Sequence, residues 1–307
     1  MDDQRPQVCP PGIGLLYFRD RNKGATIMLT SGFRVLASVV FITALALSSP
    51  ATARENVLII GGAGDTGSTL AKILIARGDK VTVFVRPSTN RHRLEGVPVE
   101  YVVGDAMIED EVAAALDGKN FTVIIDTIQI LDITDQVSYT RLYENFVPLA
   151  KRMGVKQFLI LGGGCNDRAR EDCPLSPPLY TVAKNMTVAE YILRGSGTPY
   201  TIIRIGALMP GGPDDPDSGL RTGTSYLSTD LSIFGGIWRG DLIDQIIGCT
   251  GNDACINKIF VIDDPTMKPQ LDHWLCKRSY ETDTINFHDP RCGDMPPLTI
   301  KAGDLKP

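Results

Sequence analysis

The sequence has little that would hold a metal ion and little that would attract nucleic acid. Its three histidines, His92, His273 and His288, are scattered, and there is no C-x-x-C pair, so no metal site is indicated. Residues 1–53 contain five of the 31 basic and three of the 36 acidic residues, which leaves 26 basic against 33 acidic residues, a net charge near −7. This acidic balance disfavours nucleic acid as a partner.

Long apolar runs are also missing from the body of the chain. With 43% hydrophobic residues in 307, the chain can nevertheless bury a substantial core. The apolar run at residues 35–47 follows Arg34 and precedes small residues that end in Ala51-Thr52-Ala53, which is the order of a secretory signal peptide. We expect cleavage near Ala53 and a secreted or periplasmic protein. A membrane anchor formed by residues 35–47 is the alternative, and a start at Met28 in place of Met1 stays open.

Cysteines are few but even in number beyond this segment. Six remain after Cys9 is removed with it: Cys165, Cys173, Cys249, Cys255, Cys276 and Cys292. In an exported chain such a set predicts disulfides. The economical pairing is Cys165 with Cys173, Cys249 with Cys255, and Cys276 with Cys292. Buried free thiols are the alternative.

A strand, a glycine-rich turn and a helix follow one another over residues 56–78. Residues 57–60 form a continuous apolar run, typical of a strand buried on both faces of a parallel sheet. The turn has the spacings G-x-x-G-x-x-G and G-x-G-x-x-G, formed by Gly61, Gly62, Gly64 and Gly67. The following helix is expected to end at Gly78. This order predicts a dinucleotide-binding turn, with Asp65 and Thr66 among the cofactor-binding residues, over an ordinary glycine-rich turn.

The second expected strand, residues 81–85, ends at Arg86. In dinucleotide folds an acidic residue about 20 positions past the glycines holds the ribose of NAD, whereas an arginine there accommodates the 2′-phosphate of NADP. Arg86, with Ser88, Arg91 and Arg93 close behind, therefore favours NADP over NAD. Solvated loop charges are the alternative.

Strand-like and helix-like segments alternate through the rest of the chain. Further strands are expected at residues 99–103, 121–125, 156–161, 200–205 and 258–262, and helices at 109–116, 135–153, 180–193 and 241–247. The alternation predicts an α/β fold, a doubly wound parallel-sheet Rossmann domain over residues 54–263 with a small C-terminal substrate-side region. Residues 213–229 are expected to form a loop over the sheet edge. Residues 264–307 are expected to form an irregular tail stapled by a disulfide, and residues 1–53 an N-terminal extension with the signal peptide.

Polar residues follow several strands, at the edge where open α/β sheets bind ligands. Asp105 and Thr127 each follow an expected strand, where each could bind the cofactor or cap a helix. Tyr180 and Lys184 lie four apart on one helix face, so the ammonium group can stabilise a phenolate and reach a nicotinamide ribose. We expect this pair to be catalytic, with Lys184 also binding cofactor. A surface pair is the alternative.

Seven segments in this order resemble a known family: GGAGDTGSTLAKILIARG, FVRPS, VVGD, GVKQFLILGGG, YTVAK, SGTPYTIIRIGALMPG and IWRGDLIDQIIG. They resemble the atypical short-chain dehydrogenase/reductase group, the NmrA-like NAD(P)-binding proteins, over roughly residues 55–263. The resemblance implies a Rossmann domain with NAD(P) along the glycine turn and a variable small substrate above the sheet.

Position by position, the resemblance also implies roles for single residues. Gly61, Gly64 and Gly67 match the pyrophosphate glycines, and Arg86 matches the 2′-phosphate arginine. Asp105 matches the acid near the adenine. Tyr180 and Lys184 match the family's Tyr-x-x-x-Lys pair.

The chain departs from the family at three points. The serine that usually follows the fifth strand is replaced by three glycines at 162–164, and the nearest thiol, Cys165, cannot act as a nucleophile if it is bonded to Cys173. Lys184 lies six residues before Glu190, where the family spacing is about four. The third departure is the expected export, because a protein outside the cytoplasm meets little NADP.

The sequence therefore favours an NADP-dependent oxidoreductase of short-chain dehydrogenase type that acts on a small carbonyl or sugar-like substrate. The alternatives are an exported non-catalytic NAD(P)-binding or sensor protein and a nucleotide-sugar epimerase or dehydratase. Tyr180 and Lys184 favour the enzyme, whereas the missing serine, the disulfides and the export signal favour the binding protein. The expected partner is a small molecule, with no membrane contact beyond the signal segment.

Overall fold

The computed structural model describes residues 54–130, 135, 137–175, 177–209 and 224–267. At its centre is an eight-stranded sheet with the order β3-β2-β1-β4-β5-β6-β10-β8. The strands of this sheet are β1 Asn56–Ile60, β2 Lys80–Val85, β3 Glu100–Val103, β4 Val123–Asp126, β5 Gln157–Gly163, β6 Tyr200–Ile205, β8 Tyr226–Ser228 and β10 Lys258–Asp263. The helices that cover it are α1 Asp65–Arg77, α2 Glu109–Leu116, α3 Ser138–Met153, α4 Pro177–Gly195 and α5 Arg239–Cys249.

The strand order makes the sheet doubly wound. From β1 the chain adds β2 and β3 on one side, then crosses to β4 and continues through β5, β6 and β10 on the other, all in parallel. The direction of winding therefore reverses between β1 and β4, and in folds of this kind ligands bind where the strands end at that point. The predicted Rossmann fold is confirmed.

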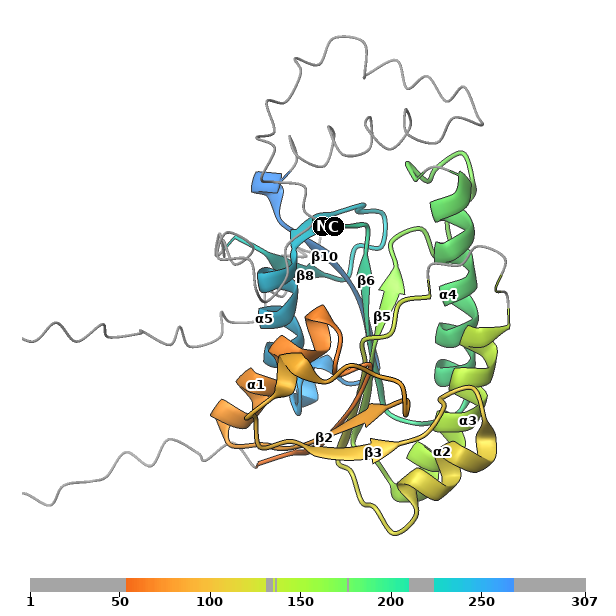
Figure 1. Ribbon diagram of the computed structural model, residues 1–307. Helices are drawn as coiled ribbons and strands as arrows, with labels where there is room; N and C mark the ends of the chain where they lie inside the picture. Colours follow the sequence, from red (N-terminus) through yellow and green to blue (C-terminus); the bar gives the residue numbers. More distant parts are fainter. Residues whose placement is uncertain (1–53, 131–134, 136, 176, 210–223, 268–307) are drawn as a thin grey trace, which may run out of the picture.

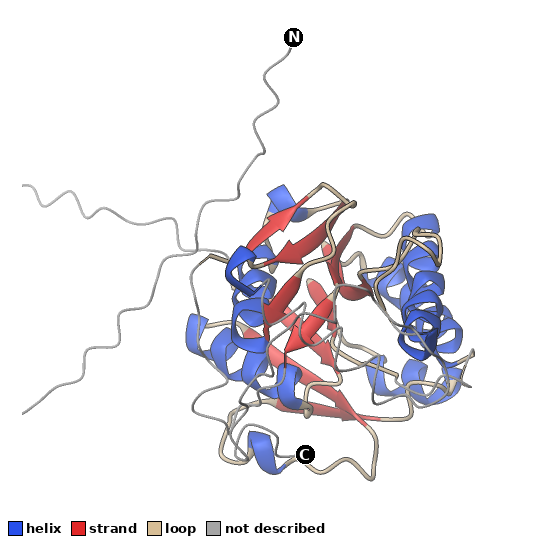
Figure 2. Ribbon diagram, turned by 90° about the horizontal axis from the view of Figure 1, so that it is seen from above, coloured by secondary structure: helices blue, strands red, loops and turns tan. Residues whose placement is uncertain are grey.

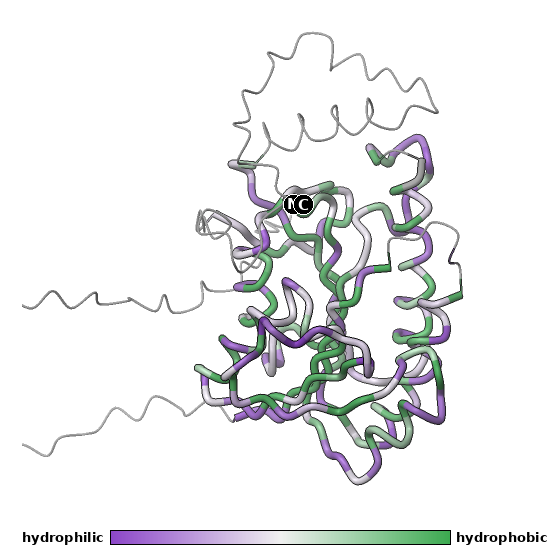
Figure 3. The backbone as a smooth tube through the Cα atoms, in the orientation of Figure 1, coloured by the Kyte–Doolittle hydropathy of each residue, from purple (hydrophilic) through white to green (hydrophobic). Residues whose placement is uncertain are grey.

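Helices cover both faces of the sheet, as Figures 1 and 2 show: α1 and α5 lie on one face and α2, α3 and α4 on the other. Along β1, Val57 and Ile59 enter the core beneath α1 and α5, while Leu58 and Ile60 enter the core on the opposite face. Burial on both faces is the reason for the continuous apolar run of this strand, and each such side chain contributes roughly 1.5–3 kcal/mol. In Figure 3 the central strands are accordingly mostly green, whereas green and purple alternate along the helices.

Glycines allow α1 to pack directly on the end of β1. A Cβ atom at Gly67 would lie 2.5 Å from the Gly61 carbonyl oxygen and 2.6 Å from Gly62 Cα, so backbone meets backbone there. A Cβ at Gly62 would lie 2.6 Å from a methyl group of Val83 in β2. At its other end α1 stops at Gly78, whose φ of 99° is left-handed and whose N–H donates to the Ile75 carbonyl, as expected for a helix C-cap.

The structure corrects the expected loop over residues 213–229. Of the residues in this span that the structure describes, Tyr226–Ser228 form strand β8, which pairs antiparallel with β10 at the sheet edge. The short parallel pair β7 Ala207–Met209 and β9 Gly236–Trp238 was likewise not expected. A three-residue strand is too short to show an alternation of apolar and polar residues. Whether it forms depends on the neighbouring strand rather than on the local sequence.

Three helix starts also differ from expectation. Helix α5 begins at Arg239, two residues earlier than expected. Helix α4 begins at Pro177, three residues earlier than expected, because proline fits the first helical turn. Helix α3 begins at Ser138 rather than residue 135, because the Asp135 carboxylate accepts a 2.8 Å hydrogen bond from the Ser138 N–H and so caps the helix from outside.

Two of the three expected disulfides are present. Cys165 is bonded to Cys173 within the connection from β5 to α4, and Cys249 to Cys255 just after α5. The third expected pair, Cys276 with Cys292, lies outside the described residues. So do the signal segment and residues 268–307 of the expected tail.

We predict that Gly67→Ala destabilises the protein by about 1–3 kcal/mol, because its Cβ would force α1 away from the backbone of the glycine turn. Gly248→Ala is the matched control: a Cβ at this α5 glycine would have nothing within 4 Å, so alanine there should be neutral or stabilising by up to about 1 kcal/mol. Urea unfolding of both variants measures the difference. Equal unfolding free energies would contradict the close packing.

Candidate functional site

The glycine turn lies at the end of β1, where the sheet reverses. Gly61 has a φ of 79°, and its carbonyl oxygen accepts a 3.0 Å hydrogen bond from the Gly64 N–H. Gly64 is exposed and caps α1 at its N-terminus, and a glycine supplies no side chain to satisfy the first helical amides. Thr66 is half-buried in that first turn. The open helix terminus therefore fits the diphosphate of a dinucleotide.

Thr127 follows β4 and lies against this turn. Its backbone N–H and its hydroxyl group each donate a 3.0 Å hydrogen bond to the Ile60 carbonyl, and its Oγ1 is 2.9 Å from where a Gly67 Cβ would be. It therefore supports the glycine turn from the neighbouring strand. This contact is not a helix cap, and its role in binding cofactor stays a prediction.

Asp105 follows β3 and closes the turn before α2. Its Oδ1 accepts a 2.9 Å hydrogen bond from the Met107 N–H, and its own N–H donates to Glu111 Oε2 at 2.7 Å. The carboxylate is half-buried. The turn role is thus observed, while the expected role beside an adenine is a prediction.

Arginines follow β2, and two arginines reach Asp65 beside the glycine turn. Arg86 is exposed at the end of β2, and the Arg91 guanidinium lies 4.7 Å from the ring centroid of Tyr101. Arg93 Nη2 is 2.8 Å from Asp65 Oδ1, and Arg239 Nη1 is 3.0 Å from Asp65 Oδ2. Sequence reasoning gave no role to Arg239, because only packing of α5 beside α1 brings it to Asp65.

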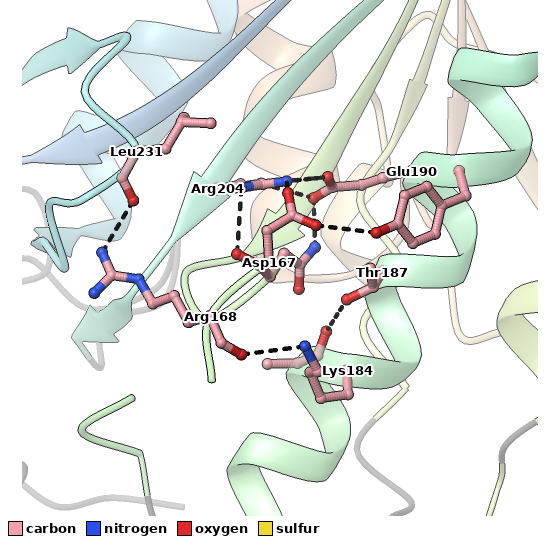
Figure 4. A network of polar contacts seen from close by, with 10 residues as sticks. Asp167, Arg168, Lys184, Thr187, Glu190, Arg204 and Leu231 are labelled. Carbon is pink, nitrogen blue, oxygen red and sulfur yellow. Dashed lines mark hydrogen bonds and ion pairs between the residues drawn. The ribbon is translucent and has the colours of Figure 1, made fainter. Parts of the chain in front are cut away.

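Tyr180 and Lys184 lie together, as their spacing predicted, and both are partly buried. The Tyr180 hydroxyl donates a 3.2 Å hydrogen bond to the backbone carbonyl of Arg168, and Lys184 Nζ donates to the same oxygen at 3.3 Å. Lys184 Nζ is also 5.5 Å from the Tyr180 ring centroid. The pair is therefore held by the connection between β5 and α4, as Figure 4 shows for Lys184.

A buried ion pair orders that connection. Arg204 of β6 is 1% exposed and Glu190 of α4 is fully buried, and Arg204 Nη2 donates to Glu190 Oε2 at 2.7 Å (Figure 4). Arg204 Nη2 also reaches Asp167 Oδ2 at 2.5 Å, and Asn166 Nδ2 donates to Glu190. Burial opposes the charge on Arg204, but Glu190 and Asp167 outweigh it and raise the pKa of Arg204.

The connection is fixed at further points. The Cys165–Cys173 disulfide closes it, and Arg168 Nη2 donates to the carbonyls of Ile233 at 2.6 Å and Leu231 at 3.1 Å. Sequence reasoning missed Glu190 and Arg204 as organising residues. A charged residue within the apolar strand TIIRI was the available signal, because a buried charge needs a partner.

The three glycines that replace the family's serine are explained by close packing. A Cβ at Gly163 would lie 2.9 Å from both Ala183 Cβ and Asn166 Oδ1, and one at Gly164 would lie 2.5 Å from Gly206 Cα. A serine side chain does not fit between β5, α4 and β6 at these positions. Cys165 is bonded to Cys173 and so cannot act as a nucleophile.

Asp126 is a buried carboxyl at the same edge of the sheet. It ends β4, is 3% exposed, and accepts hydrogen bonds from the Tyr143 hydroxyl at 2.7 Å and the Ile128 N–H at 2.8 Å. Burial raises its pKa to about 6, although both hydrogen bonds act in the opposite direction. Sequence reasoning gave Asp126 no role, because it directly follows the expected strand at residues 121–125.

The comparisons with known proteins agree with this geometry. A family model described as NAD(P)H-binding matches residues 61–232 of the 307. The chain belongs to this NAD(P)H-binding family. The expected resemblance to NmrA-like, atypical short-chain dehydrogenase/reductase proteins is thereby confirmed, and a nicotinamide dinucleotide is the cofactor class of the family.

Individual relatives are distant. The uncharacterized chloroplastic protein At2g37660 of Arabidopsis thaliana is 28% identical over 211 residues, and the match spans 59% of this chain and 59% of that protein. ChuY, an anaerobillin reductase from Escherichia coli O157:H7, has a similar structure with a TM-score of 0.56 at 19% identity, covering 68% of this chain and 97% of ChuY. A putative NAD-dependent epimerase/dehydratase from Bacillus halodurans has a TM-score of 0.55 at 20% identity, with coverage of 70% and 97%. At these identities the two structures show a shared fold.

Membrane spans and metal-ligand clusters are both absent from the described part of the chain. None of its helices has the length and apolar character of a membrane span. Within the same residues, no three or more His, Cys, Asp or Glu side chains come together as metal ligands.

The raised pKa of Asp126 predicts a pH dependence of stability. The contribution of the neutral Asp126 carboxyl to the unfolding free energy is fully present below the unfolded-state pKa near 3.8. This contribution is lost as pH rises through about 6, because the buried carboxyl must then ionise. Between pH 3.5 and pH 8, wild type should therefore lose roughly 3 kcal/mol of unfolding free energy relative to Asp126→Asn.

Urea denaturation of both proteins across this pH range measures the difference. The exposed Asp117→Asn is the control, and its difference from wild type should stay nearly constant with pH. A constant difference for Asp126→Asn as well would contradict the raised pKa.

Proposed function

We propose that this protein is an NADP-dependent oxidoreductase of short-chain dehydrogenase type that acts on a small carbonyl or sugar-like substrate. The observation that carries the proposal is the open glycine turn at the sheet reversal, with arginines at the end of β2 and the Tyr180 and Lys184 pair at the start of α4. Membership of the NAD(P)H-binding family supports the cofactor class.

The residues at the turn would hold the cofactor. The amides at the N-terminus of α1, beside Gly61, Gly64 and Gly67, would bind the diphosphate, and Arg86 the 2′-phosphate. Thr127 and Asp105 would line the same edge. The nicotinamide, when bound, supplies or accepts a hydride.

Tyr180 would transfer the proton that accompanies this redox change, and Lys184 would position the ribose. The hydroxyl of Tyr180 now donates to the Arg168 carbonyl. A substrate oxygen that receives its proton would therefore replace this carbonyl as the acceptor. An epimerase or dehydratase would use the same residues with a retained cofactor, and the B. halodurans neighbour supports that variant.

A non-catalytic NAD(P)-binding or sensor protein is the second candidate. Two observations favour it: glycines fill the position of the usual serine, and one backbone carbonyl accepts hydrogen bonds from both Tyr180 and Lys184. In this case the nucleotide would bind, but Tyr180 would only brace the connection that follows β5.

We further propose that the chain is exported after cleavage near Ala53. The two disulfides support this, because such bonds persist in oxidising compartments. N-terminal sequencing of the protein recovered from its host's culture medium or periplasm tests the cleavage site.

The cofactor preference is tested by titrating the oxidised protein with NADPH and with NADH while nicotinamide fluorescence is recorded. We expect NADPH to bind more tightly, and Arg86→Ala to weaken NADPH by about 10- to 100-fold with little effect on NADH, because only NADPH has the 2′-phosphate. Arg152→Ala removes an exposed cation from the last turn of α3 and should change neither affinity. Binding of neither nucleotide would refute the proposed function.

The proton-transfer role is tested by Tyr180→Phe in a substrate that wild type turns over. The rate should fall by about 10²- to 10⁴-fold while NADPH affinity is retained, since only the proton donor is removed. Tyr191→Phe is the control: this exposed tyrosine of α4 also loses one hydrogen bond, to Asp167, but lies outside the proposed site. An unchanged Tyr180→Phe rate would favour the binding-protein candidate.

A further inference from the structure

The buried carboxyl of Asp126 joins helix α3 to residues 127–130, the segment that follows β4. Its Oδ2 accepts a 2.7 Å hydrogen bond from the Tyr143 hydroxyl of α3, and its Oδ1 accepts a 2.8 Å hydrogen bond from the Ile128 N–H. One turn earlier in α3, the Tyr139 hydroxyl accepts a 3.0 Å hydrogen bond from the Ile130 N–H. Two tyrosines on one helix face therefore fix this segment, one of them through Asp126.

The same segment lies against the glycine turn. Thr127 donates two hydrogen bonds to the carbonyl of Ile60, the residue that directly precedes Gly61. A Cβ atom at Gly61 would lie 2.9 Å from Ile128 Cγ1 and 3.2 Å from the Ile128 nitrogen. Asp126 itself is the partner of Ile60 in the pairing of β4 with β1. The hydrogen bonds of Asp126 therefore determine the position of the residues that support the turn from the side of β4.

The titratable groups that act on Asp126 come from α3. They are the phenols of Tyr139 and Tyr143, and its sheet partners in β1 and β5 are both isoleucines. Glu190 of α4 acts on Tyr143 and is itself paired with Arg204. Burial raises the pKa of Asp126 to about 6, so this carboxyl becomes negatively charged as pH rises through that value. A charge in such a buried position acts on its surroundings more strongly than one in water.

We propose that Asp126 is a positioning residue for the dinucleotide: it holds the glycine turn in its binding shape, and a negative charge on it opposes the cofactor diphosphate. The inference rests on the proposed function, because it concerns the same turn, and it adds a pH dependence to cofactor binding. Asp126 is 3% exposed, so it acts through the turn rather than by contact with the cofactor. Because like charges repel, the cofactor should bind more tightly while the carboxyl is neutral.

The test measures the affinities of NADP and NAD by calorimetry between pH 5 and pH 8, in wild type and in Asp126→Asn. The asparagine amide keeps the size of the side chain and an oxygen acceptor for the Ile128 N–H, but it does not ionise. Relative to this variant, wild type should lose about 10-fold in affinity for both nucleotides as pH rises across the range. NAD is the decisive ligand, because it lacks the 2′-phosphate, and a phosphate monoester itself ionises near pH 6.

Tyr143→Phe tests the geometry by a second route, which also serves if Asp126→Asn fails to fold. It removes the hydroxyl that donates to Asp126 and keeps the ring, which stacks on Phe158 of β5. Since this hydrogen bond lowers the pKa of Asp126, its loss should move the fall in NAD affinity to higher pH. Tyr200→Phe is the matched control, because it removes a phenolic hydroxyl at the start of β6, at the opposite edge of the sheet, and should leave the pH profile unchanged.

The possible failures are distinguishable. If NAD affinity has the same pH profile in wild type and Asp126→Asn, the inference is overturned and the proposed function survives, even if the variant binds more weakly at every pH. A Tyr143→Phe profile identical to that of wild type would also overturn the inference. If wild type binds neither nucleotide at pH 5, the proposed function and the inference are both refuted.

Discussion

Close contact between backbone segments at one edge of the sheet is the constraint on which the rest of the structure depends. At Gly67 the first turn of α1 lies on the backbone of the glycine turn, and at Gly164 the end of β5 lies on Gly206 after β6. No side chain fits at either contact. At the first contact, Gly64 leaves the N-terminus of α1 without a side-chain cap. At the second, close packing at Gly163 and Gly164 leaves no room for a serine side chain after β5.

The buried Glu190 and Arg204 pair has a comparable role on the other side of the site. It joins α4 to β6 and, through Asp167, fixes the connection that follows β5. Removal of Arg204 would leave the buried Glu190 without an opposite charge, at a cost of about 3–5 kcal/mol, whereas Arg204 would keep Asp167 as a partner if Glu190 were removed. Because this connection carries the Arg168 carbonyl, the ion pair determines what Tyr180 and Lys184 contact. The disulfide between Cys165 and Cys173 restricts the same segment, so the geometry of the proposed proton donor is set by groups that would not touch a substrate.

These features relate the two candidate functions to one another. An oxidoreductase and a nucleotide-binding protein would share the glycine turn, the arginines near Asp65 and the fold that places them together. They differ only at Tyr180 and Lys184, where a substrate oxygen must take the place of the Arg168 carbonyl for catalysis to occur. The two candidate functions therefore differ only in what the connection between β5 and α4 allows Tyr180 and Lys184 to contact. The proposed cofactor site is the same in both.

The sequence by itself determined the alternation of strands and helices, the glycine turn, the C-cap at Gly78 and two disulfide pairings, because apolar periodicity, glycine spacing and short cysteine separations are local signals. It also placed Tyr180 and Lys184 on one helix face, since four residues make about one helical turn. It did not show that β8 runs antiparallel at the sheet edge, since three-residue strands are determined by their neighbour. Nor did it show that Glu190 neutralises Arg204 or that Arg239 reaches Asp65 across 174 residues of sequence. Only the tertiary structure decided these contacts, because the partner of a charge depends on which helices and strands pack together. The local sequence does not specify which distant segments come into contact.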